Sequence, residues 1–456
     1  MRNTVLFFIL SAVLSLSAST PLDTLQAETD EQYPKNIILM ISDGCGFNQA
    51  AAASLYQYGQ DGTQIYEKFP VKLAMSTYSK SGEGYDPQSA WKSFRYLLNK
   101  PTDSAAAATA MAAGIKTKNG YISFDSDKMP VETVLERAES WGKSTGVVTS
   151  VQFSHATPAA FAAHNKSRGN YEEIAREMIF ASSVDVIMGA GHPHFDDNGR
   201  PDHGKSYKYT GGKDSWQLLT EGLAGNDADG DGEFEFWQLI QDKQQFVDLM
   251  SGPAPERVIG IPKVHSTLQQ NRKDSDDEQL PFDTPLLENI PSLAEMTSAA
   301  LNVLDDNPSG LFLMIEGGAV DWSGHNNNSV RVIEEQIDFN RAVEAAAAWI
   351  ETSSSWDETL LIVTADHETG YLTGPDSGSK SKPVWNPLVN NGQGKMPGME
   401  WHSGGHTNQL VPFYAKGAGS GAFITLADQE DPERGSFLDN TDIANVIFSI
   451  YDLKKN

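Results

Sequence analysis

The sequence predicts an α/β protein, a three-layer α/β/α sandwich with a mostly parallel, doubly wound central sheet and two insertions. Short runs rich in Val, Ile and Leu occur without polar alternation, which is typical of parallel strands buried on both faces. Segments with helical periodicity separate these runs, as the crossover connections of a parallel sheet require. The 456 residues could form about three average domains or one large domain with insertions.

The expected elements follow from this patterning in chain order. Strands are predicted at 36–42, 146–150, 184–188, 311–315 and 359–365. Helices are predicted at 131–141, 236–250 and 331–350. Two polar stretches, about 192–288 and about 374–405, break the pattern and are expected to be insertions between sheet elements, because Gly, Asp, Pro, Ser and Asn favour irregular structure.

The first 27 residues are predicted to be a secretory signal peptide. Arg2 precedes an apolar run at 5–16, and small residues follow at 17–20. The run is too short to span a bilayer permanently, and this order of charge, apolar core and small residues is typical of a cleaved leader. We therefore expect cleavage between about 18 and 27, a mature chain of 28–456, and export to the periplasm or out of the cell.

Composition excludes several classes of protein. Lys and Arg total 34 against 61 Asp and Glu, a formal net charge of −27, which disfavours nucleic acid as the main partner. No stretch after the leader is long and apolar enough for a membrane partner to be expected. Cys45 is the single cysteine, so an internal disulfide cannot form.

Acidic residues follow three of the predicted strands. Asp43 comes after the first strand, Glu316 ends the fourth, and Asp366 and His367 follow the fifth. One such acid could simply cap a turn. Because parallel strands end at one edge of a sheet, several acids there would meet and repel one another unless cations lay between them. The pattern therefore indicates metal ions.

Two further segments could reach the same edge. If a helical turn follows Gly318, Asp321 and His325 share a face, a spacing suited to a metal ion. His406 follows two glycines and precedes an apolar run. The four other histidines of the polar stretch are interpreted as structural: His192, His194, His203 and His265.

The stretch TDSAAAATAMAAG places Ser104 at the start of a predicted helix that Gly114 would end. Taken alone, helix capping explains the serine, although a helix N-terminus also suits a nucleophile that meets a phosphate. A second predicted helix, from Pro158, would bring His164 and Arg168 onto one face. Arg168 could then bind two oxygens of a phosphate or carboxylate.

Taken together, seven features resemble the alkaline phosphatase family, in order from about residue 36 to about 453. They are Asp43, TDSAAAATA, SHATPAAF, Arg168, EGGAVDWSGH, TADHETG and GGHTNQ. The resemblance implies one catalytic domain at 28–456, a homodimer, and hydrolysis of small phosphate monoesters to inorganic phosphate and an alcohol. Ser104 would be the nucleophile that forms a phosphoserine, and Ser104 and Arg168 would bind the substrate.

The same resemblance implies two Zn²⁺ ions and one Mg²⁺ ion. The first zinc would take Asp321, His325 and His406. The second would take Asp43, Asp366, His367 and the Ser104 oxygen. The magnesium would take Asp43, Thr157 and Glu316. Zinc would supply what the residues alone lack, because no base of a Ser-His-Asp pattern is evident beside Ser104.

Two positions depart from the best-known enterobacterial pattern. His155 stands where that version has Asp, and Trp322 where it has Lys. Because other bacterial and animal members carry His at the first position, the resemblance points to a bacterial His/Trp subgroup. Both residues are expected beside the metal ligands rather than among them, and the lost acid is expected to weaken magnesium retention.

An acidic loop in the polar stretch resembles the start of a calcium-binding loop. Asp227, Asp229 and Asp231 alternate before Gly232, but the twelfth position is Gln238 instead of Glu and no helix is evident before the loop. Calcium and a solvated acidic turn both stay open here.

Two other functions also stay open. A phosphodiesterase or other phospho- or sulfo-hydrolase of the same superfamily could share these ligands, although Ser104 is followed by alanines instead of a sulfatase modification motif. A non-catalytic protein that binds metal or phosphate would keep the acids and histidines but would have no need of Ser104.

Overall fold

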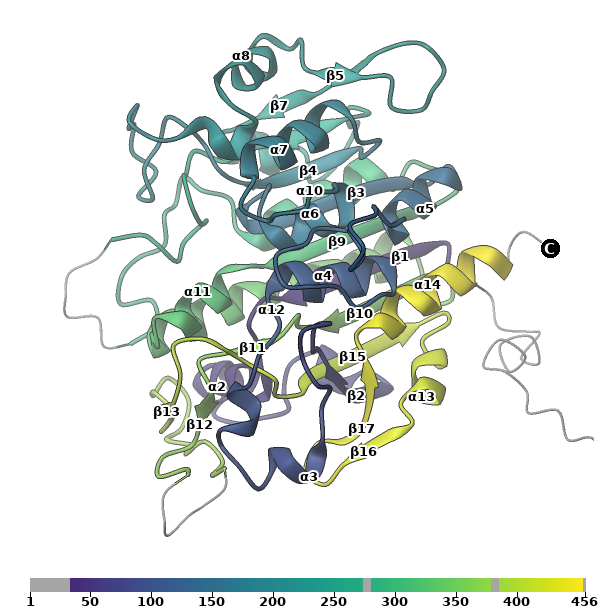
Figure 1. The fold of residues 1–456 in the computed structure, drawn as a ribbon. Coiled ribbons are helices and arrows are strands. Elements are labelled where there is room, and N and C mark those ends of the chain that lie inside the picture. The colour runs from purple at the N-terminus through teal and green to yellow at the C-terminus, as the bar shows by residue number, and fades with distance from the viewer. Residues whose placement is uncertain (1–32, 274–279, 379–384, 454–456) are drawn as a thin grey trace, which may run out of the picture. The chain divides into compact units, whose positions relative to one another are not determined.

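The computed structural model describes residues 33–273, 280–378 and 385–453, so the predicted leader lies outside the described residues. Its centre is an 11-stranded sheet (Figure 1). In sheet order the strands are β16 (Gln429–Asp431), β17 (Gly435–Asp439), β2 (Val71–Ser76), β15 (Val411–Gly417), β10 (Thr359–Thr364), β1 (Asn36–Ser42), β9 (Leu311–Gly317), β3 (Ser144–Gln152), β4 (Val186–Ala190), β8 (Val258–Gly260) and β7 (Gln238–Ile240). The run from β10 to β7 is parallel throughout, whereas β15 and β16 run antiparallel to their neighbours.

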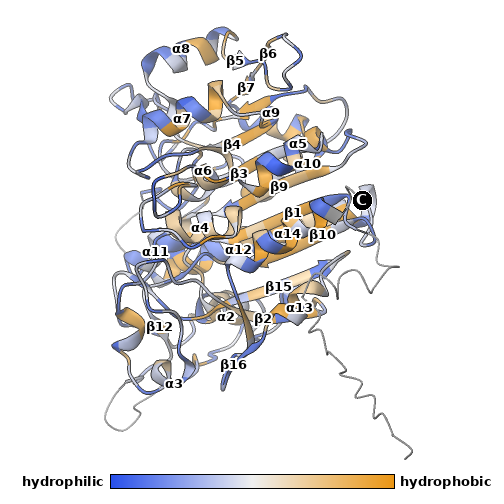
Figure 2. Cartoon of the chain, turned by 45° about the vertical axis from the view of Figure 1, so that its right-hand side comes forward, coloured by the Kyte–Doolittle hydropathy of each residue, from blue (hydrophilic) through white to orange (hydrophobic). Residues whose placement is uncertain are grey.

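Helices cover both faces of this sheet, which confirms the predicted fold class. Alternate residues of β1 point to opposite faces: Ile37 and Leu39 join one apolar cluster, and Ile38 and Met40 join the other. Helices of the first face are α4 (Ser104–Ala113), α5 (Val134–Ser140), α6 (Ala156–Ala162), α7 (Tyr171–Phe180), α8 (Lys213–Glu221), α13 (Ala422–Leu426) and α14 (Thr441–Leu453). Helices of the second face are α9 (Lys243–Asp248), α10 (Leu293–Leu304) and α12 (Ser329–Ser353). The central strands are hydrophobic along their length (Figure 2) because helices bury both of their faces.

Short elements connect the layers at the sheet's margins. The helices among them are α2 (Phe47–Tyr58), η1 (Tyr66–Lys68), α3 (Pro87–Ala90), η2 (Tyr96–Leu98), η3 (Tyr207–Thr210) and α11 (Ala319–His325). Three two-stranded sheets pair β11 (Glu368–Thr369) with β14 (His406–Thr407), β12 (Leu372–Thr373) with β13 (Glu400–Trp401), and β5 (Gly225–Asn226) with β6 (Glu235–Phe236). No helix of the described residues has the length and apolar character needed to cross a membrane.

All five predicted strands are present, with ends displaced by a few residues. Two helix predictions were close: α5 begins after Thr133, whose hydroxyl accepts from the Glu136 amide, and α12 begins after Asn328, whose side chain accepts from Arg331. The prediction for 236–250 was wrong over its first half. Residues 238–240 form β7, which pairs with β8, so the polar stretch adds two strands to the sheet. Within 236–250 only α9 is helical.

The helix expected from Pro158 is too short to place His164 and Arg168 on one face. α6 begins at Ala156 and ends at Ala162, and Ala163 is fully extended. His164 instead lies beside Glu136 and Glu177, 3.7 and 3.4 Å from their carboxylate oxygens. That helix prediction was wrong because tertiary contacts ended the helix where the local sequence carried no stop signal.

Gly417 is predicted to tolerate no side chain. It has φ +99°, and a Cβ there would lie 1.9 Å from the carbonyl oxygen of Thr359, on the neighbouring strand β10. Gly417→Ala should therefore lower the free energy of unfolding by roughly 3 kcal/mol or more, through left-handed strain and displaced backbone. Urea unfolding measures this.

Gly435→Ala is the matched control. Gly435 has φ +75° but nothing lies within 4 Å of its Cβ position, so only the conformational cost of about 1 kcal/mol remains. Equal losses in the two variants would contradict the steric explanation.

Candidate active site

Four neighbouring parallel strands present the predicted site residues at one edge of the sheet. In sheet order they are β10, β1, β9 and β3 (Figure 1). Asp43 directly follows β1, Glu316 is the penultimate residue of β9, and Asp366 is the second residue after β10. All are buried. The crevice outside the carboxyl ends of parallel strands thus collects these carboxylates, as the sequence predicted.

Ser104 is the first residue of α4 and points into this crevice. Its Oγ lies 3.2 Å from Nε2 of His367 and 3.4 Å from Oδ2 of Asp43. Capping of α4 is the role of the preceding residue, because the Asp103 carboxylate accepts from the Ala106 amide at 3.0 Å. Helix capping therefore does not explain Ser104. At the other end α4 stops at Gly114, as predicted.

Asp321, His325 and His406 form the first candidate metal group. The Nε2 atoms of His325 and His406 lie 3.1 Å apart, and each is 3.4 Å from an Asp321 oxygen. Each ring directs Nδ1 at a backbone carbonyl, of Gly404 and of Thr102, at 2.8 Å. In the neutral rings Nδ1 therefore carries the proton, and two Nε2 lone pairs and a carboxylate face one point, an arrangement that a cation stabilises.

Asp43, Asp366 and His367 meet beside Ser104. Nε2 of His367 lies 3.4 Å from Asp43 Oδ1 and 3.2 Å from Asp366 Oδ2. On the other side of the ring, Nδ1 lies 3.2 Å from the hydroxyl of Thr369, which donates its own hydrogen to Asp321 at 2.5 Å. That hydroxyl must accept from Nδ1, so the Nε2 lone pair again faces carboxylates.

Glu316 and Thr157 form a third, oxygen-only group. One carboxylate oxygen of Glu316 accepts a hydrogen bond from Thr149. Its other oxygen, Oε1, is enclosed and has no hydrogen-bond partner, and neither has the Thr157 hydroxyl or Asp43 Oδ1. Buried oxygens without partners are costly, and hard cations such as Mg²⁺ prefer oxygen ligands.

The raised pKa values of Asp43, Asp366 and Glu316 indicate that neighbouring side chains do not compensate the charge of these three acids. Burial, then repulsion by Asp366, raises the pKa of Asp43. Burial also raises the pKa of Asp366 to about 6 and that of Glu316 to about 7. Cations would hold all three ionised. The donor set, histidine nitrogens with carboxylates and a separate all-oxygen group, fits zinc and magnesium respectively.

Arg168 lies at the same edge, outside any helix. Its Nη1 is 3.1 Å from Oδ2 of Asp103, and this oxygen also accepts from the Gly120 amide at 2.9 Å. Asp103 therefore ties the guanidinium to the start of α4. Arg168 is about a quarter exposed, so it keeps donors available to a ligand.

His155 and Trp322 lie near Asp321, which precedes Trp322 in the chain and whose charge acts on His155. Their ring centroids are 5.9 Å apart. Burial, then the charge of Arg168, lowers the pKa of His155 to about 3, so the ring stays neutral. Its Nδ1 has no hydrogen-bond partner. A neutral ring here supplies no negative charge toward the oxygen-only group.

Sequence reasoning missed two positioning residues. Asp103 caps α4 and holds Arg168, and the run Asp-Ser before a helix was the available signal. Thr369 sets the tautomer of His367 and contacts Asp321, which only the tertiary structure reveals.

Comparison with known proteins decides the family. The family model described as alkaline phosphatase matches residues 34–399. The chain belongs to the alkaline phosphatase family. It is 29% identical to alkaline phosphatase 3 of Bacillus subtilis, over 92% of this chain and 90% of that protein. Such membership supports phosphatase activity.

Solved structures of the family agree. The alkaline phosphatase from the Antarctic bacterium TAB5 is 26% identical and has a TM-score of 0.61, with 92% of this chain and 98% of that chain covered. A TAB5 variant with aspartate in place of a histidine, described with Mg bound in the M3 site, has a TM-score of 0.62 at 26% identity, over 93% and 99% of the two chains.

The acidic loop of this family member joins β5 to β6, so no helix precedes it. Asp227, Asp229 and Asp231 lie with Glu235, with one oxygen of each within 4.8 Å of the others. Several of these oxygens accept backbone amides of the loop itself, as at Gly232 and Ala228. The structure thus adds Glu235 to the group, and calcium binding stays a prediction.

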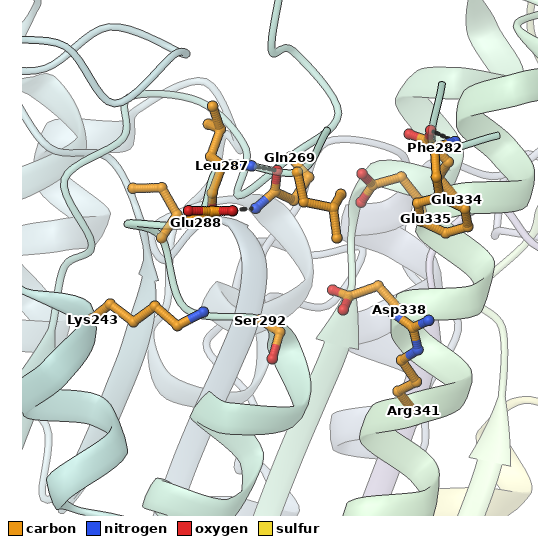
Figure 3. A pocket seen from close by; sticks show the side chains of 12 residues that line it. Lys243, Gln269, Phe282, Leu287, Glu288, Ser292, Glu334, Glu335, Asp338 and Arg341 are labelled. Atoms are coloured by element: carbon orange, nitrogen blue, oxygen red, sulfur yellow. Dashed lines mark hydrogen bonds between the residues drawn. The ribbon is translucent and has the colours of Figure 1, made fainter. Parts of the chain in front are cut away.

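A separate cavity of about 220 Å³ lies between α12 and the segment before α10 (Figure 3). Carboxylates of Glu335 and Asp338 and the ammonium of Lys243 are directed toward this space. None of the residues grouped around Ser104 lines it. Burial raises the pKa of Glu335 to about 8 and that of Asp338 to about 6.

Glu335 is predicted to make stability fall as pH rises. Its folded-state pKa is about 8, above the ordinary value of 4.5, so the folded protein binds the proton more tightly. Its contribution is fully present below about pH 4.5 and is lost as pH rises through 8. Glu335→Gln should therefore be more stable than the parent at pH 9, by roughly 2–4 kcal/mol, and similar at pH 5.

Urea unfolding at both pH values measures this effect. Glu344→Gln, at an exposed position of the same helix, is the control and should follow the parent. A Glu335→Gln variant that loses stability equally at both values would show that the carboxylate is not protonated in the fold.

Proposed function

We propose that this protein is an exported, metal-dependent phosphatase that hydrolyses phosphate monoesters through a phosphoserine on Ser104. The observation that carries the proposal is the position of Ser104 Oγ. It lies at the start of α4, within 3.4 Å of both His367 and Asp43, beside an arginine at the same edge. A hydroxyl, clustered metal-type ligands and a guanidinium together suit phosphoryl transfer, which depends on positioning and charge stabilisation.

The residues assigned to the metals follow the three groups of the site. Asp321, His325 and His406 would hold one zinc. The second zinc would be held by Asp43, Asp366 and His367, with Ser104 Oγ. The magnesium would be held by Asp43, Thr157 and Glu316. When bound, these ions lower the pKa of oxygen nucleophiles and neutralise charge on the phosphoryl group and the leaving oxygen.

The side chains then perform a two-step displacement. In the first step Ser104 Oγ forms a bond to phosphorus, the bond from phosphorus to the ester oxygen breaks, and this oxygen leaves as part of the alcohol. In the second step water attacks phosphorus, the Oγ–P bond breaks, and inorganic phosphate is released. Arg168 would bind two non-bridging oxygens, which a terminal phosphate offers. Asp103 holds both participants in place, since it caps the helix that begins at Ser104 and pairs with Arg168.

Export, the homodimer and the subgroup each rest on a separate observation. Export rests on the predicted leader at 1–27, and the homodimer on family resemblance. A His/Trp subgroup rests on His155 and Trp322, whose rings lie together near Arg168. The expectation of weak magnesium retention rests on His155 standing where the enterobacterial pattern has Asp, because a neutral ring supplies no negative charge to a cation.

Ser104→Ala is predicted to abolish turnover of an aryl phosphate monoester, by at least about 10³-fold, because the variant lacks the hydroxyl that lies beside His367 and Asp43. The measurement is kcat on 4-nitrophenyl phosphate, with zinc and magnesium content determined on the same samples. Retained metal with lost activity supports the nucleophile. Parent-like activity of the variant, or a parent that prefers bis(4-nitrophenyl) phosphate, would contradict the proposal.

Removal of metal is predicted to abolish activity and to lower Tm. Without cations, the buried carboxylates of Asp43, Asp366 and Glu316 repel one another and keep unpaired oxygens. Dialysis against a chelator, then scanning calorimetry and assay, tests this. Zn²⁺ with Mg²⁺ should restore both properties, whereas Ca²⁺ alone should not. Unchanged activity after complete chelation would be incompatible with the mechanism.

A further inference from the structure

A lysine from the polar stretch 192–288 lies beside the active site. Lys208 belongs to η3, and its Nζ lies 4.6 Å from the ring centroid of Tyr209 and 5.0 Å from that of Tyr171. Two aromatic rings attract an ammonium through their negative faces. Lys208 is thus held in place although its side chain is exposed.

A continuous row of rings joins this lysine to the site. Tyr209 packs edge-on against Tyr171 at 5.0 Å, Tyr171 stacks on His155 at 6.1 Å, and His155 lies 5.9 Å from Trp322. A hydrogen bond supports the same placement, since the side-chain hydroxyl of Ser154 donates to the backbone carbonyl oxygen of Tyr209 at 3.2 Å. The η3 segment therefore packs against the chain that leaves β3 for the active site.

Tyr171 lies between two cations. The charges of Arg168 and Lys208 both favour its phenolate, although burial keeps its pKa above the ordinary value. Arg168 in turn lies within electrostatic reach of Asp43. Tyr171 is thus the side chain that the Lys208 ammonium contacts and that also feels the charge of the proposed phosphate-binding arginine.

Lys208 has no acidic partner among the described residues, since no carboxylate there lies within ion-pair distance of it. The chain has 61 acids for 34 basic residues and a net charge of −27, yet none of the described carboxylates pairs with this ammonium. Nearby Lys205, by contrast, lies 3.7 Å from Asp202.

We propose that Lys208, held by Tyr171 and Tyr209, binds a second anionic group on the alcohol part of the substrate. This inference rests on the proposed phosphatase function. It assigns a preference for monoesters whose leaving group carries a carboxylate or a second phosphate, over monoesters with a neutral leaving group. Lys208 determines specificity and takes no part in the displacement at phosphorus.

Matched substrates test the preference. 3-Phosphoglycerate and glycerol 1-phosphate differ in a carboxylate, and fructose 1,6-bisphosphate and fructose 6-phosphate differ in a second phosphate. Lys208→Gln should lower kcat/KM about five-fold for the doubly anionic member of each pair, and less than two-fold for the other. The loss should shrink in 1 M salt, because the subsite is exposed. A loss in only one pair identifies which anion is bound.

Three variants sharpen the result. Lys208→Arg should retain most of the preference, and Tyr209→Leu should lose part of it because the ammonium is no longer held. Lys205→Gln, on the same segment but paired with Asp202, should leave all four substrates unchanged. Equal effects of Lys208→Gln on charged and neutral substrates, or none, would overturn the inference.

A binding measurement separates this inference from the proposed function. Calorimetric titration of metal-loaded Ser104→Ala with 3-phosphoglycerate and with glycerol 1-phosphate, with and without Lys208→Gln, needs no turnover. Weaker binding of 3-phosphoglycerate alone supports the subsite even if the parent proves inactive on both esters, which would contradict only the proposed function. Equal affinities in the presence and absence of Lys208 would refute the subsite.

Discussion

Repulsion among buried carboxylates at one edge of the sheet is the constraint on which the rest of this structure depends. Asp43, Glu316 and Asp366 lie near one another because β1, β9 and β10 are parallel neighbours that end together. No cation of the chain pairs directly with these three acids among the described residues, and burial raises the pKa of each. A fold that gathers such charges would gain stability from bound cations, which is the physical basis of the proposed metal sites.

Hydrogen bonds from neighbouring groups fix the orientation and the tautomer of the histidine rings around these acids. His325, His367 and His406 each direct Nδ1 to an oxygen of the protein, so that Nε2 faces the cluster. Thr369 serves two ligands at once, since it accepts from His367 and donates to Asp321. Such contacts would orient the proposed metal ligands in advance and reduce the cost of ordering them on binding.

The polar stretch 192–288 contributes to the sheet and to the surroundings of the site, although its composition indicates only a surface segment. Its η3 segment packs against the exit of β3, and its later residues supply β7 and β8 to the sheet. There Tyr209 extends the row of rings from Trp322, and Lys208 places a positive charge outside the proposed phosphate position. The acids of the site thus lie at strand ends, whereas the lysine proposed to select among substrates comes from a connecting segment.

The sequence by itself determined the α/β class, the five central strands and the residues that meet at their ends. Apolar runs without alternation can be buried only between two layers, and acids after parallel strands have one edge at which to meet. It could not determine that Asp103 rather than Ser104 caps α4, that α6 ends before His164, or that residues 238–240 form a strand. Local propensity leaves these choices nearly equal in free energy, and contacts between segments distant in the chain decide them. Tertiary structure likewise decided the histidine tautomers and the place of Lys208, because a hydrogen bond or a ring contact depends on positions in space that spacing along the chain does not encode.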